Sequence, residues 1–140
     1  MKNQLSKLFW SVAIIFSFVA LSAFVVPQDQ KTAAAWEIPA KYKAMKNTFK
    51  GDAASEKLGK LLYAKHCKSC HGNVGEGDGP KASSMKTKIG SFKNAKFQAQ
   101  TDGEIYFQGI IGRDEMPAFD KKILDEEDRW AIVNYIRTLK

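Results

Sequence analysis

The chain has 140 residues, the length of a single domain, and a formal net charge of +7. The charge is uneven: residues 41–96 hold thirteen lysines against four acids, whereas residues 97–140 hold nine acids against six basic residues. A basic half can bind nucleic acid, an anionic membrane or an acidic protein, and it can also be a merely solvated surface. The N-terminal segment argues for export, and export excludes nucleic acid as the partner.

Residues 1–26 form a targeting segment. Lys2 and Lys7 precede 19 residues without charge, from Leu8 to Val26. This run is long for a signal peptide and nearly long enough to span a bilayer, so it is either a secretory signal peptide or an uncleaved membrane anchor. Both interpretations place the rest of the chain on the periplasmic side of the cytoplasmic membrane, because the lysines stay inside.

Residues 27–51 are polar and rich in alanine and lysine, and we interpret them as a linker. A bare tether has no use for an aromatic side chain, so Trp36, Ile38 and Tyr42 predict that the linker docks in part on the domain that follows. That domain is expected to cover residues 52–140.

Ser55 is the expected N-cap of a helix over residues 56–67. Leu58, Leu62 and Tyr63 can line one face of this helix, with Leu61 beside them. Gly59 lies in its middle, where glycine costs about 1 kcal/mol relative to alanine. We therefore expect a second helix to approach closely at this point.

Residues 67–71 read Cys-Lys-Ser-Cys-His, and C-x-x-C-H signals the attachment of c-type haem. Two intervening residues let one helical turn place both sulfurs at the two vinyl groups of the porphyrin, where each forms a thioether. His71 is then carried under the iron as an axial ligand. A zinc site is disfavoured because the only cysteines and histidines of the chain fall within six residues. A thioredoxin-like redox pair is disfavoured because no βαβ pattern surrounds the motif.

Four glycines and Pro80 within residues 72–80 predict a tight loop. Residues 81–100 show irregular apolar spacing and are expected to be a loop with one short helix. Phe92 and Phe97 would cover the edge of the haem there.

Thr101 and Glu104 form a capping box, which predicts a helix that stops at Gly112. Asp125 caps a final helix over residues 126–140, whose apolar face is broad. We find no internal repeat and no convincing strand.

The second axial ligand cannot be His66, which immediately precedes Cys67 and cannot reach the far side of the same haem. A methionine thioether is the alternative, and Met45, Met85 and Met116 are the candidates. Met116 is favoured, because the following proline pushes it out of helical geometry onto an extended loop, whereas core methionines more often lie on helix faces.

The region 52–140 resembles the class I (monohaem) c-type cytochromes of the small, exported bacterial kind. The family has a glycine and an aromatic residue eight and four positions before the first cysteine, and Gly59 and Tyr63 occupy those positions. The family's proximal histidine and distal methionine match His71 and Met116.

This resemblance implies an all-α cytochrome c fold, with three to four short helices and long loops around one covalently attached haem c and its iron. It implies that the first helix crosses the last one at Gly59, with Ile132 and Tyr135 at the partner positions. It also implies that the carbonyl of Pro80 accepts a hydrogen bond from His71.

These residues predict a one-electron carrier and no enzyme, because His71 and Met116 together leave the iron no open position for a small-molecule substrate. The expected partners are redox proteins with an acidic docking surface, steered by exposed lysines such as Lys65, Lys68, Lys81 and Lys86. A membrane is a further partner through residues 8–26. Three alternatives stay open: a haem-bearing subunit of a membrane redox complex, an open-site haem enzyme or gas sensor, and a free dithiol that exchanges disulfides.

Overall fold

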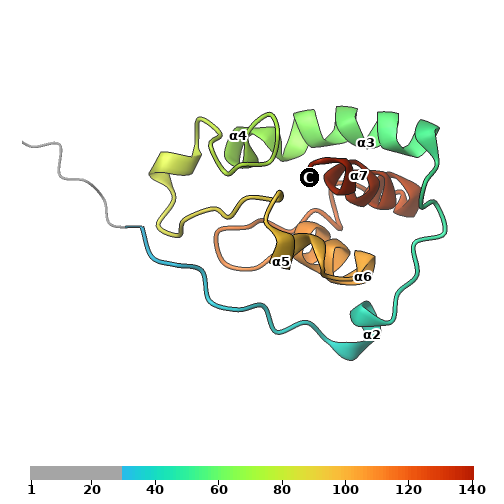
Figure 1. Ribbon diagram of the computed structural model, residues 1–140, viewed down its shortest axis with the longest axis horizontal. Coiled ribbons are helices and arrows are strands. Elements are labelled where there is room, and N and C mark those ends of the chain that lie inside the picture. Colours follow the sequence, from blue (N-terminus) through green and yellow to red (C-terminus); the bar gives the residue numbers. More distant parts are fainter. Residues whose placement is uncertain (1–29) are drawn as a thin grey trace, which may run out of the picture.

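The computed structural model describes residues 30–140, so the predicted targeting segment, residues 1–26, lies outside the described residues. The elements, in chain order and labelled as in Figure 1, are α2 (Ala40–Lys43), α3 (Ala53–His66), α4 (Lys68–His71), the 3₁₀ turn η1 (Ala82–Ser84), α5 (Ala95–Gln98), α6 (Asp102–Tyr106), the π-helical η2 (Phe107–Ile111) and α7 (Glu126–Thr138). Residues 30–140 contain no strand beyond two isolated bridges, and the predicted all-α class is confirmed. The helices beyond the expected three or four are mostly single turns.

The two long helices, α3 and α7, form the centre of the fold and lie side by side in Figure 1. Gly59 is buried between them: a Cβ atom built there would lie 1.8 Å from the carbonyl oxygen of Ala131. The predicted close approach at Gly59 is therefore confirmed. Of the two predicted partner positions, Tyr135 is in contact there: its Cβ lies 3.0 Å from the Cβ atom built on Gly59. Ile132, the other predicted position, is buried on α7.

The start of α3 differs from the expectation. Asp52 is the N-cap, its carboxylate accepting from the amide of Ala54, while Ser55 lies buried one turn further on. The hydroxyl of Ser55 instead accepts from Asn134 on α7, at 2.8 Å. Leu61 is 64% exposed, so it stands outside the apolar face.

The other predicted caps are confirmed. Thr101 and Glu104 form the capping box of α6, and Asp125 caps α7 by accepting from the amide of Glu127. The helical run of α6 and η2 ends at Gly112, whose φ of +71° is a conformation that glycine adopts without strain.

One contiguous core joins these helices, and α7 supplies the largest share of it. Its buried members are Tyr63, Cys67, Ile105, Tyr106, Ile110, Phe119, Ile123, Trp130, Ile132, Val133, Ile136 and Leu139. Because Cys67 is part of this cluster, the haem motif lies at the edge of the core.

Residues 30–39 run along the outside of the domain to α2, as the blue segment of Figure 1 shows. Trp36 contacts Phe107 edge to face, with ring centroids 6.1 Å apart, and the ring of Tyr42 lies 4.7 Å from that of Phe107. A Cβ atom built on Gly103 would lie only 1.9 Å from the carbonyl oxygen of Tyr42. Between residues 30 and 140, no helix has both the length and the apolar character needed to cross a membrane.

Candidate functional site

The five residues of the C-x-x-C-H motif lie where α3 passes into α4. The amide of Cys67 donates to the carbonyl of Tyr63 at 2.8 Å, and the amide of His71 donates to the carbonyl of Cys67 at 3.0 Å. The backbone therefore keeps a helical turn through the motif, which places both cysteines on one turn. Both thiols are free, Cys67 buried and Cys70 half-buried.

Tyr63 fixes the end of this turn. Its ring is 2% exposed, and its hydroxyl donates to the carbonyl of Gly72 at 2.8 Å. Burial raises the pKa of the Tyr63 hydroxyl well above its usual value, so the group remains protonated and keeps its donor role. Sequence reasoning found Tyr63 as a family position, but not this hydrogen bond.

The glycine-rich loop packs directly against the motif. The amides of Gly79 and Lys81 donate to the carbonyls of Cys70 and Ser69, at 3.2 and 2.9 Å. A Cβ on Gly79 would lie 2.5 Å from the Ser69 carbonyl oxygen, so this contact requires glycine. Pro80, between the two donors, is exposed.

The predicted hydrogen bond from His71 to the carbonyl of Pro80 is not formed in the structure. His71 Nδ1 is buried and has no hydrogen-bond partner within the described chain. The loop is held instead by the amides of Gly79 and Lys81, on either side of Pro80, which donate to the carbonyls of the motif.

The His71 imidazole has the properties of a metal ligand. Burial lowers its pKa to about 4, so the ring is neutral at pH 7, and the neutral ring is the form that binds iron. The ring stacks on Phe92, with centroids 4.6 Å apart and planes 21° apart, and Phe92 in turn contacts Phe97. A neutral imidazole with an unpaired nitrogen, next to two free thiols, fits the attachment of haem c through Cys67, Cys70 and His71.

Burial, with a smaller contribution from Cys70, raises the pKa of the Cys67 thiol to about 12. Disulfide exchange needs a thiolate, and reactive cysteines have lowered rather than raised pKa values. The surroundings of Cys67 therefore disfavour this thiol as the attacking group of a disulfide exchange.

The three candidate methionines lie in different surroundings. Met45 and Met116 are half-buried and pack against the core cluster, whereas Met85 lies beside the N-terminal segment, its carbonyl accepting from Gln30 at 2.9 Å. Met116 ends a tight turn, in which it exchanges two backbone hydrogen bonds with Arg113, at 2.9 and 2.8 Å. Met116 thus lies on a turn that a reciprocal pair of backbone hydrogen bonds closes.

In a comparison with protein-family models, residues 56–140 match the family described as Cytochrome c. The matched region is more than half of the chain and contains the whole C-x-x-C-H motif. The chain belongs to the cytochrome c family. A search of curated proteins found no match.

Family membership confirms the predicted cofactor, a covalently bound haem c with its iron, and indicates haem-based electron transfer. Among this chain's residues, the thiols of Cys67 and Cys70 and the imidazole of His71 are the groups that fit this cofactor. The match begins at residue 56, so residues 30–55, including the segment that contacts Phe107 and Gly103, lie outside it.

Proposed function

We propose that the protein is a one-electron carrier on the periplasmic side of the cytoplasmic membrane, with no catalytic activity of its own. The thiols of Cys67 and Cys70 would hold haem c as thioethers, and His71 and Met116 would supply the two protein ligands of its iron. When bound, haem c supplies a one-electron couple, and a thioether ligand raises its potential relative to a second imidazole. The observation that carries the proposal is His71, whose buried Nδ1 has no hydrogen-bond partner among residues 30–140, on the same turn as two free thiols.

The protein's own residues would do three things for this couple. The core cluster and the Phe92 ring exclude water from the His71 side of the site. The glycine-rich loop covers the backbone of the motif and fixes its turn. Met116, on its braced loop, completes the ligand set and keeps small molecules off the iron. The alternatives are a fixed haem subunit of a membrane redox complex, and an open-site enzyme or gas sensor.

The optical spectrum of the holoprotein tests the ligand set. We expect a sharp low-spin spectrum on reduction, and in the oxidised protein a weak red-edge band from sulfur-to-ferric-iron charge transfer. The band should disappear in Met116→Ala and persist in the matched control Met85→Ala, because only Met116 is proposed to bind the iron. A high-spin wild-type spectrum that shifts at once with carbon monoxide would instead support the enzyme or sensor.

Two small oxidants, one anionic and one cationic, test whether the exposed lysines steer charged redox partners to the protein. Lys65, Lys68, Lys81 and Lys86 are all exposed; Lys68 lies within the C-x-x-C-H motif, and Lys65 lies two residues before it. We expect oxidation by anionic hexacyanoferrate(III) to slow as salt rises from about 0.01 to about 1 M, because the screening length falls from about 30 to about 3 Å. Oxidation by a cationic cobalt(III) complex should speed up over the same range.

The charge reversal Lys68→Glu should weaken the salt dependence seen with the anion, while Lys43→Glu, at an exposed lysine of α2, should alter it less. A rate that salt does not change would remove the docking role of the lysines, without touching the assignment of the ligands.

A further inference from the structure

The loop that carries Met116 is closed by its own backbone. Arg113 and Met116 pair across a turn with Asp114 and Glu115 at its tip, and Asp114 has a φ of +49°. A Cβ on Gly112 would lie 2.4 Å from the Met116 carbonyl oxygen, so the turn folds back tightly on the end of η2. Surface loops of this kind are mobile unless other segments hold them. Two charged side chains of the turn make such contacts.

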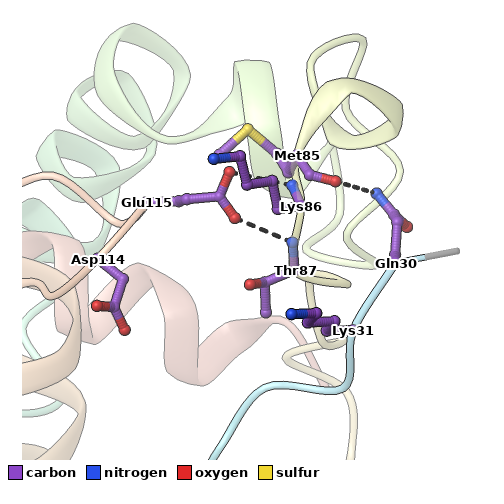
Figure 2. A pocket seen from close by; sticks show the side chains of 7 residues that line it. All are labelled: Gln30, Lys31, Met85, Lys86, Thr87, Asp114 and Glu115. Carbon is purple, nitrogen blue, oxygen red and sulfur yellow. Dashed lines mark hydrogen bonds between the residues drawn. The ribbon is translucent and has the colours of Figure 1, made fainter. Parts of the chain in front are cut away.

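Glu115 ties the turn to residues 86–87. Its carboxylate accepts from the amide of Lys86 at 3.0 Å and from the amide of Thr87 at 2.9 Å, as the dashed lines of Figure 2 show. The same stretch is also bonded to Lys31 in the N-terminal segment. The amide of Lys31 donates to the carbonyl of Lys86, and the amide of Lys88 donates to the carbonyl of Lys31, both at 2.9 Å.

Gln30 adds to this contact. Its side-chain amide donates to the carbonyls of Ala82 and Met85, at 2.7 and 2.9 Å. Figure 2 shows Gln30 and Glu115 on opposite sides of the segment that they both hold. Residues 82–88 are thus fixed between the N-terminal segment and the Met116 turn.

Arg113 ties the turn to the N-terminal segment directly. Its guanidinium donates to the carbonyl of Ala35 at 2.7 Å and to the carbonyl of Ala34. The same group lies 4.1 Å from the centre of the Trp36 ring, which rests edge-on against Phe107 of η2. A planar cation that donates to two carbonyls and stacks on an indole is a contact that lysine cannot reproduce.

We propose that residues 30–36, Arg113 and Glu115 form a clamp that positions Met116, so that the N-terminal segment controls how long the methionine stays on the iron. This inference rests on the proposed Met116 ligation. Residues 30–36 lie before residue 56, where the family match begins, whereas Arg113 and Glu115 lie within the matched region. Arg113 and Glu115 are positioning residues: they hold the loop and do not touch the iron.

Heating the oxidised holoprotein, with two signals followed together, tests the clamp. The red-edge charge-transfer band reports the iron–sulfur bond, and the far-ultraviolet circular dichroism reports the fold. In Arg113→Lys we expect the band to fade at a temperature well below the loss of helix, with the opened fraction raised on the order of tenfold, as the loss of charge-assisted hydrogen bonds predicts.

Arg137→Lys is the matched control. Arg137, on α7, also donates to two backbone carbonyls, those of Gln98 and Gln100 at 2.7 and 2.5 Å, and it pairs with Asp102. It has no part in the clamp, so both signals should shift together in this variant. Parallel shifts in Arg113→Lys, or no shift at all, would show that Arg113 is only a packing residue and would overturn the proposal.

Glu115→Ala gives an independent measurement, with Glu127→Ala, at an exposed residue of α7, as its control. Carbon monoxide should bind the reduced Glu115→Ala protein faster than it binds wild type or Glu127→Ala, because Met116 leaves the iron more often. Equal rates in all three proteins would count against the clamp. If the wild-type protein lacks the charge-transfer band, Met116 ligation itself is refuted. If Met116→Ala removes the band but the clamp variants leave it unchanged, the clamp alone is refuted.

Discussion

Replacing Gly59 with alanine is expected to lower the melting temperature of the holoprotein by about 10 °C or more. The added methyl would stand 1.8 Å from the carbonyl oxygen and 2.5 Å from the carbonyl carbon of Ala131, and neither is the end of a flexible side chain. The helices α3 and α7 would have to separate, at a cost of about 3 kcal/mol for a small domain. The gain in helix propensity, about 1 kcal/mol, does not offset this.

The matched control is Gly109→Ala. Gly109 is also helical, in η2, and a Cβ there meets nothing within 4 Å. We expect it to leave the melting temperature unchanged or to raise it slightly. A melting temperature of Gly59→Ala within about 3 °C of the wild-type value would correspond to a loss of less than 1 kcal/mol in a domain of this size. The two helices could then separate at little cost, and the packing argument would be wrong.

Replacing Asn134 with leucine is expected to lower the free energy of unfolding by about 3 kcal/mol. Asn134 is 4% exposed, donates to the carbonyl of Phe49 at 2.7 Å and to the hydroxyl of Ser55 at 2.8 Å, and accepts from the Asn47 amide at 2.7 Å. Leucine has a similar volume but would remove the hydrogen-bond partner of the Phe49 carbonyl, the Ser55 hydroxyl and the Asn47 amide. The Ser55 side chain is 2% exposed, so it could not form a replacement hydrogen bond with water.

Urea unfolding of the double-mutant cycle with Ser55→Ala measures how much of this loss belongs to the buried pair. We expect Asn134→Leu to cost about 1 kcal/mol less in the Ser55→Ala background, because one unsatisfied group has already been removed. Strict additivity of the two substitutions would mean that Ser55 and Asn134 do not interact as the structure shows. Asn94→Ala, at the exposed cap of α5, provides a reference of about 1 kcal/mol for a simple capping loss.

The features that the sequence predicted well are those that depend on near neighbours in the chain. The capping box of Thr101 and Glu104 and the cap at Asp125 join residues within one helical turn, so their spacing is visible in the sequence. The haem motif is readable for the same reason. Gly59 was informative because a glycine inside a helix is costly, and its close contact with α7 supplies the reason.

The features that it predicted poorly depend on contacts between distant residues. Ser55 looks like an N-cap, but its hydroxyl is engaged by Asn134, 79 residues away, and Asp52 caps the helix instead. The stack of Phe92 on His71 joins the haem motif to residues 81–100, whose apolar spacing is irregular. The roles of Arg113 and Glu115 depend on backbone carbonyls and amides, which are present in every sequence and therefore leave no pattern to find.

The docking of residues 30–36 also limits how far the haem domain could travel if the targeting segment were kept as an anchor. Only residues 27–29 would then lie between Val26 and the docked Gln30, and the four steps from residue 26 to residue 30 span at most about 14 Å in an extended chain. A domain on so short a tether could not travel between distant donors and acceptors. The side that holds residues 82–88 would stay near the bilayer, and redox partners would have to come to the domain.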